Sequence, residues 1–313
     1  MSITTLPPDV RRDVEFAIFA ARTAGERVLG LRATGRWKDE SMLADIGDQA
    51  ADGYIQGLVR GRYPGDGILS EETADSSERL SRSRVWIIDP LDGTREYSQQ
   101  REDWAVHVAL TIDGRCAIAA LALPARGKLL WGVCTEGMRV AGLESTGDAQ
   151  RDRASGATSE GPSASASDRS SAAADHSASS TAHRAAGRAV RGDGKLPSLT
   201  RIAVSRSHTP SWMPRFAATL DAMQVHSGSV GNKVAMLLLG EADVYAHRKG
   251  LKEWDTCAPE TVARALGWCV SRLNGEDLRY NQPDPHVDEF LVCRVAHREA
   301  VLRALRTAGV VTI

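Results

Sequence analysis

The stretch that decides the fold is VWIIDPLDGT, residues 85–94. It begins as an apolar run of strand length and ends in two carboxylates, a glycine and a hydroxyl. Pro90 fixes its own φ and favours an extended backbone at Asp89, whereas Gly93 permits a tight turn. Asp89 and Asp92 can therefore converge on one point, where they repel each other unless a cation lies between them or one is protonated.

Two other interpretations of this stretch compete with a metal site. The letters DPLDG are also ordinary turn chemistry. Phosphatases that form an aspartyl-phosphate carry Asp-x-Asp-Gly-Thr after an apolar strand, but their two acids are closer in sequence than Asp89 and Asp92. The wider spacing favours a shared metal over a covalent intermediate, and the other ligands must then come from elsewhere in the chain.

Length and composition describe an ordinary globular protein. The 313 residues allow one large domain or two smaller ones, and 42% of them are apolar. A net charge of −1 gives no basic face for nucleic acid. Met1–Arg12 lacks the apolar core of a signal peptide, and no apolar run is long enough to span a bilayer. The five cysteines include no Cys-x-x-Cys pair, which favours reduced thiols. We therefore expect a cytoplasmic protein without nucleic-acid or membrane partners.

The first part of the chain reads as helices followed by strands. Apolar residues at helical spacing predict a helix over Pro8–Leu31. A second helix is predicted to begin between Asp45 and Asp48, where Asp48 could cap the helix or take part in catalysis. A short strand at Ile68-Leu69 leads into Ser70-Glu71-Glu72. Three further strands within 104–133 predict an antiparallel meander.

A polar segment divides the chain. From Glu144 to Ala189 there is no Leu, Ile, Val, Phe, Met, Trp or Tyr, so little apolar burial could offset the entropy of ordering it. We predict a disordered insertion at 144–195 between an N-terminal half, 1–143, and a C-terminal half, 196–313. Strands alternate with helices in the C-terminal half, which predicts an α/β layering.

Several acids share similar settings. Glu71, Asp89 and Asp92 follow apolar strands, while Asp48 and Asp255 lie at predicted helix starts. All are oxygen donors, which suit Mg²⁺ or Mn²⁺ better than Zn²⁺. Helix N-termini at the same point would bind an anion, most simply a phosphate. Together these features predict metal-assisted hydrolysis of a phosphate ester.

Three motifs resemble the signatures of the inositol monophosphatase superfamily. They are LSEE (69–72), DPLDGT (89–94) and WD (254–255), in the family's order, and the likeness spans nearly the whole chain except the insertion. The segment 86–96 is most similar to CysQ-type phosphatases, which remove the 3′-phosphate of adenosine 3′,5′-bisphosphate (PAP), a by-product of sulfate assimilation. The segments 103–107 and 278–282 resemble actinobacterial members. The resemblance implies an α/β sugar-phosphatase fold, an α-β-α-β-α sandwich.

The resemblance also implies a metal centre. Glu71, Asp89 and the carbonyl of Leu91 would hold one Mg²⁺, and Asp89, Asp92 and Asp255 would share a second. The number of ions, two or three, is left open by the sequence. The family's reaction is direct in-line attack by water, without a phospho-enzyme, and it is inhibited by Li⁺.

Further roles carry over to residues beside the metals. Glu71 and Thr94 would orient the attacking water, and Asp48 would assist as a base or as a partner of a third metal. The backbone of Gly93 and Thr94 would receive the phosphate. The residues expected to contact the rest of the substrate are Ser205, His208, Ser229, Lys233, His247 and Arg248.

The substrate contacts leave alternatives. His208 could stack on adenine or meet a phosphate, or its loop could only cap the helix expected from Pro210. Ser229 and Lys233 match the family's Gly-Ser…Lys segment. Enterobacterial forms have an arginine where this chain has His247, so either His247 or Arg248 could serve the 5′-phosphate.

The predicted function is a Mg²⁺-dependent 3′(2′),5′-bisphosphate nucleotidase. Activity on inositol phosphates or fructose 1,6-bisphosphate is the first alternative, because the same core serves these substrates in the superfamily. A non-catalytic phosphate or nucleotide sensor is the second. Homodimers are usual in parts of the superfamily, and the sequence leaves the oligomeric state open.

Overall fold

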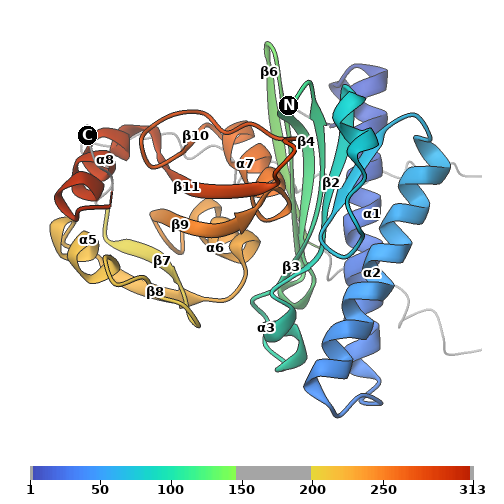
Figure 1. Ribbon diagram of the computed structural model, residues 1–313, viewed down its shortest axis with the longest axis horizontal. Coiled ribbons are helices and arrows are strands. Elements are labelled where there is room, and N and C mark those ends of the chain that lie inside the picture. The colour runs from blue at the N-terminus through green and yellow to red at the C-terminus, as the bar shows by residue number, and fades with distance from the viewer. Residues whose placement is uncertain (1–2, 146–198, 311–313) are drawn as a thin grey trace, which may run out of the picture.

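The protein is built from alternating layers of helices and sheets (Figure 1). The computed structural model describes residues 3–145 and 199–310. Helices α1 (Pro8–Ala33) and α2 (Glu40–Arg62) cover the outer face of a six-stranded sheet. Helices α6 (Val230–Leu238) and α7 (Glu253–Ala265) lie between this sheet and a five-stranded sheet. Helices α5 (Met213–Thr219) and α8 (Arg298–Thr307) pack on the far side, which confirms the predicted α-β-α-β-α sandwich.

The first sheet has the order β1-β2-β3-β4-β5-β6. β1 runs parallel to β2, and the remaining pairs are antiparallel, as the predicted meander requires. The short helix α3 (Thr94–Ser98) connects β2 to β3. The strands are β1 (Gly67–Ser70), β2 (Arg84–Asp92), β3 (Ala105–Ile112), β4 (Arg115–Leu123), β5 (Lys128–Thr135) and β6 (Met138–Ser145).

The second sheet has the order β10-β11-β9-β7-β8. β7 runs parallel to both β8 and β9, while β9, β11 and β10 pair antiparallel. The strands are β7 (Arg201–Ser205), β8 (Met223–Ser227), β9 (Val244–Lys252), β10 (Trp268–Ser271) and β11 (His286–Arg294). Short 3₁₀ helices lie at Ile3–Thr5, Ser77–Ser81, Pro124–Arg126 and Val295–His297.

The apolar run of β2 is continuous because both faces of the strand are covered. Successive side chains of a strand point to opposite faces. Trp86 and Ile88 pack with α1 and α2, whereas Val85 and Ile87 belong to the cluster shared with α6 and α7. All are 1% exposed or less, so this strand is anchored between two helical layers before it reaches its acids.

Three predicted boundaries are wrong. Helix α2 begins at Glu40 rather than between Asp45 and Asp48, because the Asp39 carboxylate caps it by accepting from Met42 N at 2.8 Å. Asp48 therefore lies well inside α2. β2 continues through Asp92, so both of its acids lie in the strand, with a register shift between them.

The third wrong boundary concerns the end of the first half. Strand β6 was not predicted, and it includes Glu144 and Ser145, which pair with Leu129 and Lys128 of β5. Backbone pairing with β5 keeps these two polar residues in a strand, although neither contributes an apolar side chain. The rest of the predicted insertion lies outside the described residues. Within the described residues, no helix is both long and apolar enough to cross a membrane.

Candidate active site

The pairing of β1 with β2 brings two acidic motifs together. These strands are parallel, so their carboxyl ends meet at the same edge of the sheet. Ser70 lies opposite Ile88, and Glu71 N donates to the Ile88 carbonyl at 3.3 Å. Glu71 and Asp89 therefore follow two neighbouring, paired backbone positions. This topology converts two motifs that are distant in sequence into one acidic site.

The end of β2 and the turn after it are held by local hydrogen bonds. Leu91 N donates to Asp89 Oδ1 at 3.2 Å, and Thr94 Oγ1 donates to the Leu91 carbonyl at 3.1 Å. Gly93 has φ of 93°, which favours glycine. A Cβ at Gly93 would also lie only 3.1 Å from the Ser229 Cβ. The glycine thus allows both the turn and the close approach of the segment that opens α6.

Asp92 joins the end of β2 to the start of α6. Its Oδ1 accepts from Val230 N at 3.1 Å and its Oδ2 from Gly231 N at 2.6 Å. A carboxylate at a helix N-terminus is stabilised by the unpaired amides and by the positive end of the helix dipole. Ser229 caps the same helix by accepting from Asn232 N at 2.8 Å. These contacts fix the orientation of the Asp92 carboxylate.

The remaining two acids come from helices. Asp255 lies in the first turn of α7, as predicted, and its Oδ2 accepts from Lys252 N at 2.6 Å. Asp48 is only 6% exposed, and its Oδ1 has no hydrogen-bond partner. The charges of Glu71 and Glu72 act on it, which places Asp48 beside the same cluster although it does not begin a helix. The structure thus gathers all five predicted acids.

The cluster is electrostatically unfavourable without a cation. Burial raises the pKa of Asp48 to about 8, and the charges of Glu72 and Glu71 add to the rise. Burial and the charge of Asp92 raise the pKa of Asp255 to about 7. The pKa of Asp89 is also raised well above its usual value, by burial and then by Glu71. Repelling carboxylates that hold protons near neutral pH are a suitable site for a divalent cation.

Glu71 and Asp92 differ from these three acids. Glu71 is exposed as a residue, but its carboxyl faces the cluster, so desolvation and the charge of Asp92 raise its pKa to about 7. Burial also raises the pKa of Asp92, yet His107 and the amide of Gly231 bring it below its usual value. Asp92 is therefore the carboxylate that stays ionised most readily.

Sequence reasoning assigned no role to His107. This side chain of β3 is fully buried, opposite Asp89 in the register. Its Nδ1 lies 3.0 Å from the Trp254 carbonyl, and its Nε2 lies 3.0 Å from Asp92 Oδ2, although not aligned for a hydrogen bond. Ligand atoms of Asp89, Asp92 and His107 all lie within 4.8 Å of one another. A histidine inside an otherwise apolar strand was the available signal.

The donor set fits a hard divalent cation. Four of the acids, the Leu91 carbonyl and the unpartnered Oδ1 of Asp48 supply oxygen atoms, which Mg²⁺ and Mn²⁺ prefer. His107 adds a nitrogen at the edge of the set, turned toward Asp92. An oxygen-rich cluster with raised pKa values has the chemistry of a magnesium or manganese centre.

Two predicted substrate residues lie against this centre. Ser229 approaches Gly93, as described above. Lys233 is 3% exposed, its Nζ donates to the Gly228 carbonyl, and the ammonium lies 5.3 Å from the centroid of the Tyr245 ring. Burial lowers the pKa of Lys233 to about 8, against the opposing effects of Asp92 and Glu96. A buried cation beside an acidic centre is suited to contact an anionic substrate.

The other predicted substrate residues are farther out. His208 is exposed, and its backbone N donates to Ser205 Oγ at 3.3 Å. His247 Nδ1 lies 3.3 Å from the Tyr245 hydroxyl, on the same face of β9 as Tyr245. Burial lowers the pKa of His247, and the charges of Lys233 and His208 contribute. Arg248 is exposed and, as the next residue in the strand, points to the opposite face.

Comparison with known proteins establishes the family. The sequence profile of the inositol monophosphatase family matches residues 9–309, so the chain belongs to the inositol monophosphatase family. It is 35% identical over 304 residues to the 3′-phosphoadenosine 5′-phosphate phosphatase of Mycobacterium leprae, covering 94% of this chain and 93% of that protein. The Mycobacterium tuberculosis protein of the same name is 35% identical over 291 residues, covering 91% of this chain and 90% of that protein.

Solved structures share the fold. CysQ from Bacteroides thetaiotaomicron superposes with a TM-score of 0.67 at 24% identity, covering 90% of this chain and 97% of that chain. SuhB from Mycobacterium tuberculosis gives a TM-score of 0.63 at 19% identity, covering 96% and 98%. At these identities the likeness concerns the fold alone. The resemblance inferred from the three motifs is confirmed.

Proposed function

We propose that the protein hydrolyses the 3′-phosphate of adenosine 3′,5′-bisphosphate to give AMP, as a magnesium-dependent phosphoric monoester hydrolase. The observation that carries the proposal is the buried acidic cluster at the end of β2, in which Asp48 and Asp255 have pKa values raised to about 8 and about 7. The similarity to mycobacterial phosphatases of this bisphosphate supports the substrate. The proposal includes removal of this by-product of sulfate assimilation.

The proposed metal ligands are the residues that the motifs predicted. Glu71, Asp89 and the Leu91 carbonyl would hold one Mg²⁺, and Asp89, Asp92 and Asp255 a second. Bound divalent cations would neutralise the carboxylates and polarise the phosphate oxygens. Asp48 would serve a third cation or act as a base.

The chain's own groups would prepare the attacking water. Because Thr94 Oγ1 donates to the Leu91 carbonyl, its lone pairs can accept a hydrogen bond from water and so orient the molecule. Glu71, with its pKa raised to about 7, can accept the proton that the water loses. The backbone amides of Gly93 and Thr94 would hold the phosphate beside this water.

The buried cation Lys233 and its neighbours would hold the rest of the substrate. Lys233 and Ser229 lie next to the acidic centre, and His247 shares its strand face with Tyr245. This arrangement favours His247 over Arg248 as the partner of the 5′-phosphate. Ser205 and His208 would contact the nucleoside from the loop after β7.

The direct test is phosphate release by the purified protein with and without Mg²⁺. We expect PAP to be hydrolysed faster than inositol 1-phosphate or fructose 1,6-bisphosphate at equal concentration, and Li⁺ to inhibit the reaction. Preference for either sugar phosphate would retain the mechanism and reject the substrate. No release from any substrate, with Mg²⁺ binding retained, would favour a phosphate sensor instead.

His107 is expected to support the metal centre by orienting the proposed ligand Asp92. Its two nitrogens lie 3.0 Å from Asp92 and 3.0 Å from the Trp254 carbonyl, so it joins the second and third motifs. Residues that orient metal ligands typically contribute on the order of 10- to 100-fold in affinity. We expect His107→Ala to weaken Mg²⁺ binding, measured by calorimetry, by about this factor. The exposed His226 provides the control His226→Ala, and equal affinities in the two variants would contradict the role.

A further inference from the structure

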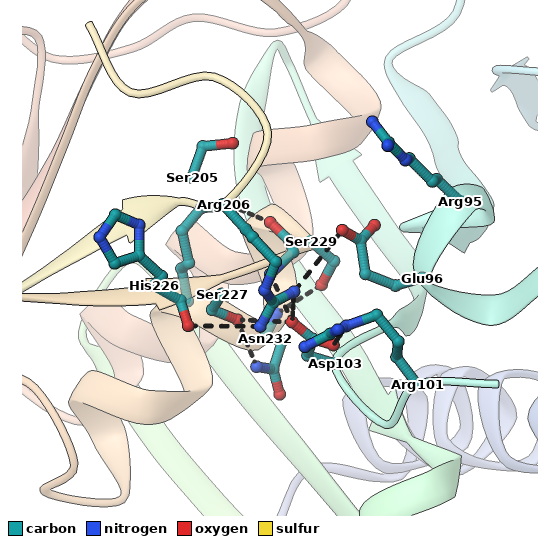
Figure 2. A network of polar contacts seen from close by, with 12 residues as sticks. Arg95, Glu96, Arg101, Asp103, Ser205, Arg206, His226, Ser227, Ser229 and Asn232 are labelled. Atoms are coloured by element: carbon teal, nitrogen blue, oxygen red, sulfur yellow. Dashed lines mark hydrogen bonds and ion pairs between the residues drawn. The ribbon is translucent and has the colours of Figure 1, made fainter. Parts of the chain in front are cut away.

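A carboxylate outside the predicted site connects the segments expected to bind the substrate. Asp103 lies in the loop between α3 and β3, in the first half of the chain. Its Oδ2 accepts from Arg206 Nη1 at 2.5 Å and from Gly228 N at 2.6 Å, and its backbone carbonyl accepts from Ser229 N at 3.2 Å. One residue thereby holds both the loop after β7 and the turn that opens α6. Figure 2 shows Asp103 at the meeting point of these groups.

The Arg206 side chain is held by contacts with other parts of the protein. Besides Asp103, its guanidinium lies 3.7 Å from Glu96 Oε1, and its Nη2 donates to the His226 carbonyl at 3.4 Å. Its backbone N donates to the Ser227 carbonyl at 3.0 Å. Figure 2 shows its side chain directed toward Asp103. Arg206 therefore fastens the segment that carries Ser205 and His208 rather than presenting a free charge.

Both backbone polar groups of Gly228 are held by side chains. Its N–H donates to Asp103, and its carbonyl accepts from the buried Lys233 ammonium. A Cβ at Gly228 would overlap the Glu96 side chain, so α3 packs directly on this turn. The direction of the Lys233 side chain is thus tied to the Asp103 carboxylate through a single residue, Gly228.

We propose that Asp103 is a positioning residue that sets substrate affinity and the preference for a nucleoside bisphosphate. Through Arg206 and Gly228 it fixes the relative positions of the loop that carries His208 and of the Lys233 ammonium. The inference rests on the proposed function. It assigns no part in metal binding or in the attack of water to Asp103, because none of its contacts reaches the acidic centre directly. Its substitution should therefore affect KM more than kcat.

The test compares Asp103→Asn with a matched control, Glu102→Gln. Glu102 is the neighbouring carboxylate and is exposed, so the control makes the same charge change beside the network. We expect Asp103→Asn to raise KM for PAP about tenfold, the usual effect of losing a charged hydrogen bond, with kcat changed less than about threefold. The ratio of kcat/KM for PAP to that for adenosine 3′-monophosphate should fall, because the monophosphate lacks the 5′-phosphate.

Two further measurements separate this role from a loss of folding. Arg206→Gln should also raise KM for PAP. The KM of the double variant should lie within about twofold of that of the more impaired single variant, because the two side chains act as a unit. Hydrogen exchange should accelerate at Arg206, Gly228 and Ser229 in Asp103→Asn, with little change in α1.

The outcomes are distinct. Unchanged KM and unchanged exchange at these amides would overturn the proposal, as would a fall in kcat at constant KM. If the wild-type protein releases no phosphate from PAP, the proposed function fails, and exchange at Arg206, Gly228 and Ser229 still decides whether Asp103 holds the two segments.

Discussion

Asp92→Asn is expected to lower kcat by on the order of 10³-fold or more, because it removes a charge worth several kcal/mol to the proposed metal site. Asp92 is the acid of the cluster whose pKa is lowered, chiefly because His107 and the amide of Gly231 overcome the effect of burial. It therefore keeps its charge under conditions where its neighbours hold protons. The readout is phosphate release from PAP at saturating Mg²⁺ and substrate.

The same substitution tests the fold separately from the chemistry. An asparagine keeps one acceptor oxygen for Val230 N or Gly231 N and places its NH₂ group, a donor, against the other amide. Loss of one such bond costs about 1–3 kcal/mol, and relief of repulsion within the cluster offsets part of this. We expect a cooperative melting transition near that of the wild type.

The control for this experiment is Asp113→Asn. Asp113 is an exposed turn residue with φ of 50°, a conformation that asparagine adopts equally well. The control should retain both stability and turnover. Undiminished turnover in Asp92→Asn would reject the assignment of Asp92 to the metal centre.

Much of the site was predictable because its acids follow strong strand patterns. The apolar run 85–88 and the pair Ile68-Leu69 each specify a strand; Glu71 directly follows β1, and Asp89 and Asp92 lie in the last part of β2. Their parallel pairing then places Glu71 beside Asp89. Asp255 was likewise correctly placed in the first turn of its helix, where its side chain accepts from the backbone of Lys252.

The errors arose where local signals compete. Asp39, Asp45 and Asp48 are all good helix caps, and only the contact with Met42 N selects Asp39. Strand β6 has weak apolar content and depends on backbone pairing with β5. His107 and Asp103 were missed as functional residues because their partners, Trp254 and Arg206, lie more than a hundred residues away. Such contacts exist only after the two halves have packed together.

Asp48→Asn is expected to stabilise the metal-free protein while impairing catalysis. Asp48 is buried in α2, its Oδ1 has no partner, and burial with the charges of Glu72 and Glu71 raises its pKa to about 8. The folded protein therefore retains a proton that the unfolded chain releases near pH 4. Because the native state binds more protons, this group lowers the free energy of unfolding as the pH rises from about 4 to about 8.

The size of the effect should grow with pH. One pKa unit corresponds to about 1.4 kcal/mol, and relaxation of the cluster reduces the full value, so we expect a gain of a few kcal/mol at pH 8. That gain corresponds to a rise in Tm of roughly 5 °C or more in the presence of a chelator. At pH 4 the variant and the wild type should melt at nearly the same temperature, since Asp48 is then protonated in the folded protein and about half protonated in the unfolded chain.

Magnesium should reverse the order of stabilities. A cation that binds only the folded protein raises its Tm by mass action, and the wild type with its full set of carboxylates should bind Mg²⁺ more tightly than the variant. Asp45→Asn on the exposed surface of the same helix is the control: the Asp45 charge contributes less to the raised pKa of Asp48 than burial, Glu72 and Glu71 do, so the Tm of this variant should change with pH much less than that of Asp48→Asn. A metal-free Asp48→Asn protein that is less stable than wild type at pH 8 would mean that the Asp48 carboxylate has a favourable partner, and its place in a cation site would have to be abandoned. A variant that is more stable but inactive would instead show that the repulsive cluster lowers the stability of the fold and is retained because cation binding, and therefore the reaction, requires it.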